Sequence, residues 1–245
     1  ATVDQCGVCG GNNDCTTNYS LKFDGVDDYI QLSSSVRIGT TPITVMFRAK
    51  TDNYSVSASM DIISQACDTD CDGDFRLQFS TGQCELEGVS FKSPAHFATY
   101  PFNVGDNKWH NYVYVFGENG DYSYSNMKVY VDGNEISFNC GHNWGEWNYS
   151  LPDIPMTIGK GIDGHSYFSG YIYNVAVFSK SLSMEMVQEY VDYSFSGNEN
   201  DLVGYWNFNE GSGSYVYDQS GNENNGVLIG ATWAECDDNN YDCVN

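Results

Sequence analysis

The sequence predicts an all-β fold, a two-sheet antiparallel jelly-roll sandwich with one short helix and terminal segments tied by disulfides. The chain of 245 residues is long enough for one domain with a full hydrophobic core. Its aromatic fraction is 15%, dominated by 19 Tyr, and aromatic side chains suit the faces of sheets. Short runs rich in bulky residues alternate with Gly, Asn and Asp turns, which is typical of a sandwich. We predict strands at Tyr29–Leu32, Ile43–Ala49, Phe75–Phe79, Val89–Phe91, Trp109–Phe116, Lys128–Val131, Met156–Ile158, Gly170–Phe178 and Leu202–Phe208.

The clearest of these elements is a β-hairpin in the middle of the chain. Aromatic residues and valines alternate along the run that starts at Trp109. This period of two places Tyr112, Tyr114 and Phe116 on one face and the valines on the other. A polar turn follows, and the second run, Lys128–Val131, ends in an Asp-Gly dipeptide that favours a tight turn. The pattern therefore predicts two antiparallel strands.

One segment breaks the strand pattern. Residues Ser181–Val191 have apolar side chains at helical spacing, a Ser at the start and an acidic residue, Glu185, soon after it. These features predict one short helix within Ser181–Tyr193.

Three segments resemble a known family. The hairpin carries the dipeptide WH and then KVYVDG, residues 21–30 read LKFDGVDDYI, and residues 202–228 read LVGYWNFNEGSGSYVYDQSGNENNGVL. These segments resemble those of laminin G-like domains, which have the concanavalin A-like lectin/glucanase fold. The resemblance implies the sandwich predicted above, with a helix at the same place. It leaves the ligand open, because this fold serves sugar binders, adhesion modules and hydrolases alike.

The order of the matching segments differs from that of many relatives, in which the WNFNEGSG segment precedes the FDG segment. Here it follows the predicted helix. About thirty residues after Leu202 cannot bury a core of their own. We therefore expect Tyr205–Phe208 and Gly226–Leu228 to pair near Leu21–Phe23 within one domain; the alternative is the start of a second, truncated domain.

The two ends of the chain are rich in cysteine. Residues 1–17 form a Cys/Gly head that resembles the CGVCGG linker modules of large secreted proteins, residues 18–234 the sandwich, and residues 235–245 an acidic tail. Nine cysteines indicate an oxidising, extracellular location, secreted or at the cell surface, and the odd number leaves one thiol free or bonded to another chain. Zinc in the head is disfavoured because no His lies nearby. The expected disulfide cysteines, with open connectivity, are Cys6, Cys9, Cys15, Cys67, Cys71, Cys84, Cys140, Cys236 and Cys243.

Net charge and hydropathy exclude two classes of partner. The formal charge of −23 repels phosphate backbones, so nucleic-acid binding is disfavoured, and it favours divalent cations. No run approaches the roughly 20 apolar residues that span a bilayer, so we expect no membrane span.

Calcium is the expected cofactor. Ca²⁺ prefers carboxylate and carbonyl oxygens, and Asp24, Asp27 and Asp28 supply carboxylates around one Gly turn. The family resemblance implies Ca²⁺ near such segments and adds Asp218 and Asn222, which follow the WNFNEGSG motif. The alternative interpretation is that these residues are turn formers without a metal.

A second acidic loop offers a weaker calcium site. Its residues Asp68, Asp70, Asp72 and Asp74 copy the start of an EF-hand loop, but Phe79 stands where the bidentate Glu is needed. An EF-hand is rejected on this ground. A different Ca²⁺ loop or a solvated acidic hairpin tip both remain open.

Candidate ligand-binding residues lie in an aromatic loop. Trp144, Trp147 and Tyr149 form either a stacking platform for a sugar ring or a loop that folds back onto the sandwich. Catalysis is disfavoured, because glucanases of this fold use paired carboxylates on one strand and Glu85–Glu87 lacks the third acid of that pattern. N-glycosylation acceptors stand at Asn18, Asn53 and Asn148.

Two functions fit these features. The first is a non-catalytic extracellular recognition or adhesion module that binds glycan or protein with calcium-supported loops. The second is a structural subunit of an extracellular fibre, sheath or matrix. In the second case the cysteine-bearing head would contact a neighbouring copy, so that the chain self-assembles.

Overall fold

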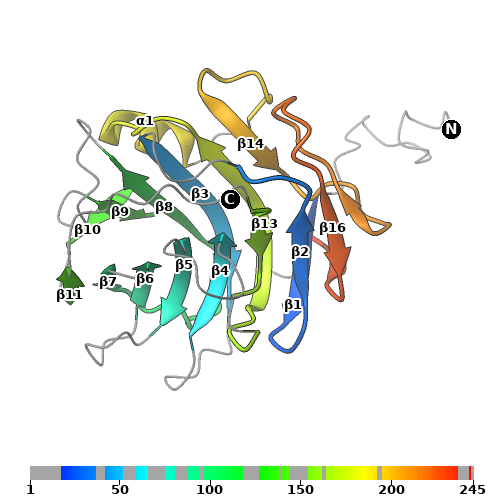
Figure 1. Cartoon of the computed structure of the whole chain (residues 1–245), viewed down its shortest axis with the longest axis horizontal. Coiled ribbons are helices and arrows are strands. Elements are labelled where there is room, and N and C mark those ends of the chain that lie inside the picture. The colour runs from blue at the N-terminus through cyan, green and yellow to red at the C-terminus, as the bar shows by residue number, and fades with distance from the viewer. Residues whose placement is uncertain are drawn as a thin grey trace, which may run out of the picture.

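The computed structural model describes residues 18–36, 42–51, 59–65, 75–80, 88–93, 96–117, 127–137, 140–143, 154–161, 164–191, 195–236 and 243, with backbone alone at 90–93, 96–97 and 140–143. In this part of the chain two antiparallel sheets pack face to face (Figure 1). The prediction of a two-sheet antiparallel sandwich with one short helix is therefore confirmed.

The first sheet has eight strands. In spatial order it contains β10 (Asn134–Ile136), β9 (Lys128–Val131), β8 (His110–Phe116), β3 (Ile43–Lys50), β13 (Ser169–Phe178), β1 (Tyr19–Asp24) and β17 (Thr232–Glu235), and β14 (Leu202–Trp206) also pairs with β13.

The second sheet has nine strands. In spatial order it contains β11 (Cys140–Asn143), β7 (His96–Pro101), β6 (Gly88–Ser93), β5 (Phe75–Ser80), β4 (Met60–Gln65), β12 (Thr157–Ile158), β2 (Tyr29–Leu32), β16 (Gly226–Ile229) and β15 (Tyr215–Val216).

Aromatic rings fill the space between the two sheets. Phe47 of β3 stacks on Tyr112 and Tyr114 of β8, with ring centroids 5.2 and 6.1 Å apart. From the opposite sheet, the Phe79 ring centroid lies 4.9 Å from that of Tyr112. Val113 points the other way, into a separate cluster outside this core. The alternation predicted for the hairpin is therefore confirmed, and each such aromatic pair adds about 1 kcal/mol to the burial of its rings.

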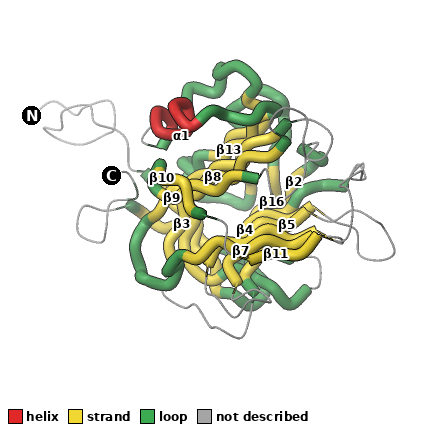
Figure 2. The backbone as a smooth tube through the Cα atoms, turned by 90° about the vertical axis from the view of Figure 1, so that its left-hand side faces the viewer, coloured by secondary structure: helices red, strands yellow, loops and turns green. Residues whose placement is uncertain are grey.

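The helix α1 (Met184–Tyr190) covers part of the outer face of the eight-stranded sheet (Figure 2). Ser183 caps it, because its hydroxyl accepts a hydrogen bond from the Met186 amide at 3.4 Å. Val187 is buried against Val113 and Phe178 of the sheet. The helix lies within the predicted Ser181–Tyr193 and has Glu185 in its first turn, but its cap is Ser183 rather than Ser181, whose hydroxyl donates instead to the carbonyl of Phe116 at 2.7 Å. No helix in the described segments is long and apolar enough to cross a membrane.

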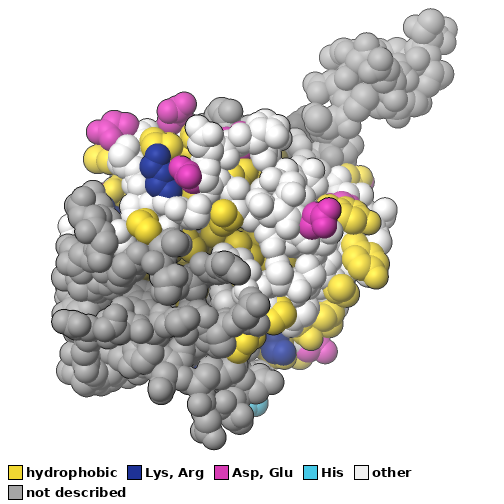
Figure 3. Space-filling view, turned by 45° about the horizontal axis from the view of Figure 1, so that its top comes forward, with side chains coloured by type: hydrophobic (Ala, Val, Ile, Leu, Met, Phe, Trp, Pro, Cys, Tyr) yellow, Lys and Arg dark blue, Asp and Glu magenta, His cyan; other side chains and the backbone are white. Residues whose placement is uncertain are grey.

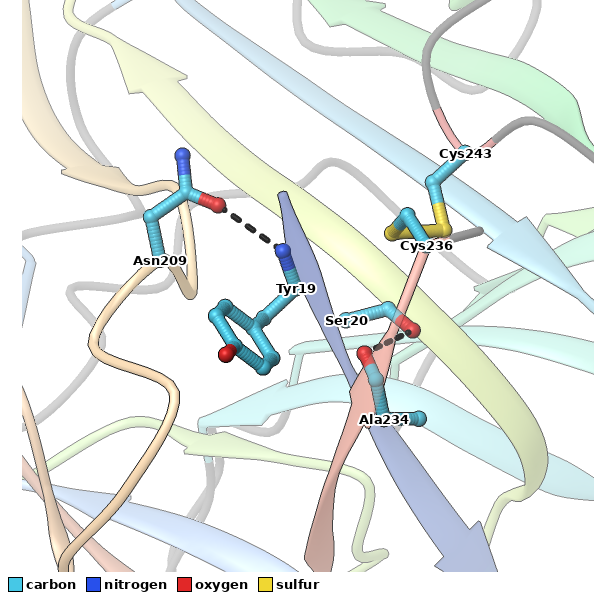
Figure 4. Close-up of a disulfide and its surroundings, with 6 residues drawn as sticks. All are labelled: Tyr19, Ser20, Asn209, Ala234, Cys236 and Cys243. Atoms are coloured by element: carbon cyan, nitrogen blue, oxygen red, sulfur yellow. Dashed lines mark hydrogen bonds between the residues drawn. A yellow bond between two sulfur atoms is a disulfide. The ribbon is translucent and has the colours of Figure 1, made fainter. Parts of the chain in front are cut away.

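The two ends of the described chain lie side by side (Figure 4). Strand β1 pairs with β17, and Ser20 Oγ donates a hydrogen bond to the carbonyl of Ala234 at 3.5 Å. Just beyond β17, Cys236 forms a disulfide with Cys243, and its amide donates to the carbonyl of Asn18 at 2.8 Å. The cysteine-bearing tail thus closes on itself beside the first strand.

The C-terminal strands complete the two sheets, but not at the predicted places. Strand β13 is ten residues long; its first half pairs with β1 and its second half with β14. The other edge of β1 is taken by Thr232–Glu235, which the sequence did not single out as a strand. Strand β16 pairs with β2 in the opposite sheet. The expectation that Tyr205–Phe208 and Gly226–Leu228 pair near Leu21–Phe23 is therefore wrong, because β13 and β17 occupy both edges of β1.

Candidate functional site

The turn between β1 and β2 gathers three carboxylates. The ligand oxygens of Asp24, Asp27 and Asp28 lie within 4.8 Å of one another. Asp28 Oδ2 accepts a hydrogen bond from the Asp24 amide, and Asp24 Oδ1 accepts one from the Val26 amide, both at 2.8 Å. Gly25, with φ of 80°, permits the reversal. We call these three side chains the acidic turn.

Repulsion within the acidic turn acts most on Asp28, which is buried whereas Asp24 and Asp27 are exposed. Burial raises the pKa of the Asp28 carboxyl, the hydrogen bond from the Asp24 amide opposes this, and the charges of Asp24 and Asp27 raise the pKa further. Gly230 lies directly against this carboxylate, where a Cβ would collide with Oδ1. A cation bound here would relieve the repulsion among the three groups.

Asp218 and Asn222 lie elsewhere, in the loop between β15 and β16. The carboxylate of Asp218 accepts hydrogen bonds from the amides of Tyr205, Ser220 and Asn224 at 3.0, 2.8 and 3.0 Å. The Asn222 amide group donates to the Ser220 hydroxyl at 3.0 Å. Both oxygens of Asp218 are therefore engaged in holding its own loop against β14.

The acidic turn and the Asp218 loop flank opposite ends of β2. Asp28 directly precedes the strand, whereas Ser33, directly after it, donates a hydrogen bond from its amide to the Asn225 carbonyl at 2.8 Å. The length of β2, about 13 Å for four residues, separates the two groups. The two groups therefore lie apart rather than in one cluster, and calcium at the acidic turn stays a prediction.

A continuous row of side chains crosses the outer face of the nine-stranded sheet, the face that points away from the core. Direct cross-strand pairs link each residue to the next through six strands, so the row spans roughly 24 Å. We call it the outer-face row; from β15 to β5 it consists of Tyr215, Val227, Gln31, Thr157, Ser64 and Arg76.

Exposure falls along this row from Tyr215 of β15 to Ser64 of β4. Tyr215 and Val227 are 55% and 42% exposed, and Tyr217, two residues along from Tyr215, is 51% exposed. Figure 3 shows hydrophobic side chains gathered along the side of the molecule on which β16 lies in Figure 1. Gln31 and Thr157 are half-buried, and Ser64 is buried. The exposed end of the row is thus aromatic and apolar, and its centre is polar.

Hydrogen bonds fix the polar centre of the row. Ser64 Oγ lies 2.8 Å from Thr157 Oγ1, and both hydroxyls reach the carbonyl of Lys160, at 2.7 and 3.0 Å. The Lys160 ammonium lies 4.4 Å from the ring centroid of Tyr29, whose side chain shares this outer face. Tyr29 directly follows Asp28, so the acidic turn borders the outer face.

Further polar side chains are buried on the same face beyond the row. Asp61 and Gln78 form a cross-strand pair, and both are buried. Among the described residues, Thr99 Oγ1 is fully buried and has no hydrogen-bond partner. Because buried polar groups are rarely left unpaired, an ordered water is the expected partner of this hydroxyl.

His110, part of the WH motif, has a structural position. Its Nδ1 lies 2.6 Å from Asp132 Oδ2, and its Nε2 lies 3.2 Å from Asp106 Oδ1. Burial lowers the pKa of His110, but the hydrogen bonds and charges of Asp132 and Asp106 outweigh it and leave the pKa raised. The His110 side chain therefore ties β8 to the turn after β9.

Several predicted site residues lie outside the described residues: Asp68, Asp70, Asp72, Asp74, Glu85–Glu87, Trp144, Trp147, Tyr149, Cys6, Cys9, Cys15, Cys67, Cys71, Cys84, Asn53 and Asn148. Cys140 begins β11 with its backbone alone described, and Asn18, half-buried, precedes β1. Calcium in the second loop, the aromatic-loop platform and glycosylation therefore stay predictions.

Sequence reasoning missed the exposed end of the outer-face row. The signal was present in the alternation Tyr215-Val216-Tyr217, a pattern typical of two exposed side chains around a buried one, and both rings are exposed whereas Val216 is buried. From the sequence, this segment was interpreted only as part of a motif that resembles laminin G-like domains.

The fold and its surfaces define a jelly-roll sandwich domain of the kind shared by lectins and glucanases. The family model of the concanavalin A-like lectin/glucanases superfamily matches residues 24–188, and the chain belongs to this family. A comparison of the sequence with curated proteins found no match.

Solved structures share the fold at low sequence identity. A proposed carbohydrate binding protein from Bacteroides ovatus superposes with a TM-score of 0.64 at 15% identity, covering 89% of this chain and 60% of that one. A heptameric SAP-like pentraxin from Limulus polyphemus gives 0.57 at 14% identity, covering 89% and 95%. The CBM40 of the Ruminococcus gnavus IT-sialidase, bound to α2,6-sialyllactose, gives 0.50 at 13% identity, covering 71% and 97%. This chain thus spans 60% of the length of the Bacteroides protein.

Proposed function

We propose that this domain is a non-catalytic, extracellular glycan-recognition module that binds its ligand at the exposed end of the outer-face row, beside a calcium-holding acidic turn. The observation that carries the proposal is that Tyr215 and Gln31 stand on one sheet face, with the exposed Tyr217 two residues along the chain from Tyr215. Two exposed rings offer flat apolar surfaces for sugar rings, and the neighbouring amide offers a donor and an acceptor for hydroxyls.

Calcium supports this surface in the proposal. Asp24, Asp27 and Asp28 would hold the ion through carboxylate oxygens, which are the ligands that Ca²⁺ prefers. The bound ion would fix the turn that leads directly into Tyr29, and so the start of the strand that carries Gln31.

Two further observations support the non-catalytic and extracellular parts. Among the described side chains of this outer face, Asp61 is the single carboxylate, whereas glycoside hydrolysis needs a pair. The Cys236–Cys243 disulfide is of the kind that persists in oxidising compartments. Carbohydrate binding by the Bacteroides and Ruminococcus proteins, as their descriptions state it, agrees with a glycan ligand.

A glycan array followed by titration calorimetry tests the proposal. We expect a neutral oligosaccharide to bind, and Tyr215→Ala and Tyr217→Ala each to weaken its affinity about two- to tenfold through lost stacking. Tyr217→Phe should bind almost normally, because the ring is kept. Met184→Ala, which removes a 44% exposed side chain from α1 on the opposite sheet, is the matched control and should have no effect. Equal effects of Tyr215→Ala and Met184→Ala would refute the placement of the site.

A further inference from the structure

The positive charges of this acidic protein are unevenly placed. The chain has 10 Lys and Arg against 33 Asp and Glu. Lys22 of β1 and Arg48 and Lys50 of β3 stand on the outer face of the eight-stranded sheet. A concentration of cations on one face of such a chain marks a place suited to an anion.

Two of these lysines form a row with two aromatic rings. In the sheet register Lys22 pairs with Tyr171, and Tyr171 pairs with Lys50. The Lys50 ammonium lies 4.9 Å from the ring centroid of Tyr171 and 5.4 Å from that of Trp109, and the two rings are 6.3 Å apart. We call Lys22, Tyr171, Lys50 and Trp109 the lysine–aromatic row. Across four neighbouring strands it measures about 14 Å, the length of a short oligosaccharide.

The members of the row differ in exposure in a way that suits binding. Lys50 is 9% exposed and held between the rings, so its charge is fixed in place. Lys22 is exposed, and its ammonium lies 5.8 Å from the ring centroid of Tyr171. Tyr171 and Trp109 are half-buried and leave part of their rings accessible. The row thus combines an exposed cation, a fixed cation and two apolar ring surfaces.

Neighbouring acids limit the size of the ligand. Asp24, exposed at the end of β1, lies two residues from Lys22, and Asp106 is paired with Lys108 at 3.4 Å and with His110. A long polyanion would extend past these carboxylates into the field of a chain whose net charge is −23. The charge pattern therefore favours a short acidic ligand over a nucleic acid, although aromatic and basic groups also suit single strands.

We infer that the lysine–aromatic row binds a short acidic saccharide, one that carries carboxylate or sulfate groups on rings with an apolar face. The exposed Lys22 ammonium would meet an acidic substituent, the buried charge of Lys50 would add to the positive field beside it, and the rings of Tyr171 and Trp109 would pack against the sugar. This surface lies on the sheet opposite to the outer-face row, so the inference goes beyond the proposed function and does not depend on Tyr215 or Tyr217.

Titration calorimetry at low salt tests whether the lysine–aromatic row binds acidic saccharides. The probes are a sulfated disaccharide, a uronic-acid tetrasaccharide and the neutral parent of each. We expect at least one acidic sugar to bind more tightly than its neutral parent, and about 0.5 M salt to remove the preference because the Debye length then falls to a few ångström. Comparison of the two acidic probes decides between sulfate and carboxylate.

Variants locate the binding. Lys22→Gln, at an exposed position, should lower the affinity for the acidic sugar about three- to fivefold. Tyr171→Leu should also lower this affinity. The matched control Lys180→Gln removes the same charge beside Asp201, away from the row, and should change affinity less than about 1.5-fold. Neutral-sugar binding at Tyr215 should be unaffected by Lys22→Gln, which separates failure of this inference from failure of the proposed function.

Three results would overturn the inference. The first is acidic and neutral sugars binding equally at low salt. The second is Lys22→Gln and Lys180→Gln weakening binding to the same extent. The third is a single-stranded oligonucleotide binding more tightly than either acidic sugar, with the same loss in Lys22→Gln.

Discussion

The imidazole of His110 is hydrogen-bonded to the carboxylate of Asp132, with Nδ1 and Oδ2 2.6 Å apart. Asp132 stands in the turn after β9 with φ of 49°, and its other oxygen accepts from the Asn111 amide at 2.9 Å. The WH and DG motifs, 22 residues apart in the hairpin, therefore form one contact. This relationship explains both motifs by stability rather than by ligand binding.

Because of the contact between His110 and Asp132, the stability lost on replacing His110 should depend on pH. Burial alone would raise the pKa of Asp132 and of Asp106, but the hydrogen bonds that each accepts leave both lowered from 3.8, whereas the pKa of His110 is raised from 6.5. The His110 contribution is complete below about pH 6.5 and is lost as pH rises through its folded pKa; the aspartate contribution is lost as pH falls through theirs. Urea unfolding should therefore show His110→Gln costing about 1 kcal/mol near pH 5 and less near pH 8.

Lys108→Gln provides the control for this prediction. The Lys108 side chain is 70% exposed and pairs with the same Asp106, so its substitution should lower the free energy of unfolding only slightly and almost independently of pH. A flat pH profile for His110→Gln would show that the ionised contact does not stabilise the fold.

Asp218 should be important for stability rather than for metal binding. Asp218→Ala leaves three backbone amides without their acceptor and is expected to cost about 2–3 kcal/mol. Asp218→Asn keeps one oxygen and should cost less. Asp201→Asn, at an exposed carboxylate, is the control, and thermal unfolding measures all three. A calcium-dependent effect of Asp218→Asn would instead return this residue to the metal site.

Calcium should stabilise the native protein through the acidic turn. A ligand that binds the folded state alone stabilises by about 2.7 kcal/mol at a concentration 100-fold above its Kd. Added Ca²⁺ should therefore raise the melting temperature, and chelator should reverse the change. Asp27→Asn, at an exposed turn position, should remove the response without disturbing the fold. An unchanged melting temperature with and without Ca²⁺ would rule the site out.

Gly230 and Gly213 form a matched pair. Both have positive φ, 77° and 88°, so an Ala at either position costs about 1 kcal/mol in backbone strain. A Cβ at Gly213 meets nothing within 4 Å, whereas one at Gly230 collides with the Asp28 carboxylate. Chemical denaturation should show Gly230→Ala costing clearly more than Gly213→Ala. Equal losses would mean that the acidic turn adjusts freely.

The sequence alone determined the local elements of this protein. Alternation in Tyr112–Phe116 predicted which side chains share a face, the Ser start and the early Glu185 predicted a helix within Ser181–Tyr193, and the FDG turn placed three carboxylates together. These are predictable because side-chain period, capping and turn chemistry depend on residues a few positions apart.

Only the tertiary structure decided which segments meet. It separated Asp218 from Asp24 by the length of β2, placed Thr232–Glu235 beside β1, and aligned Tyr215 with Gln31 and Lys22 with Lys50 across strands far apart in the chain. Strand register is a non-local choice, fixed by which apolar faces bury against each other. The candidate binding surfaces consist of such cross-strand alignments, and for that physical reason no local pattern contained them.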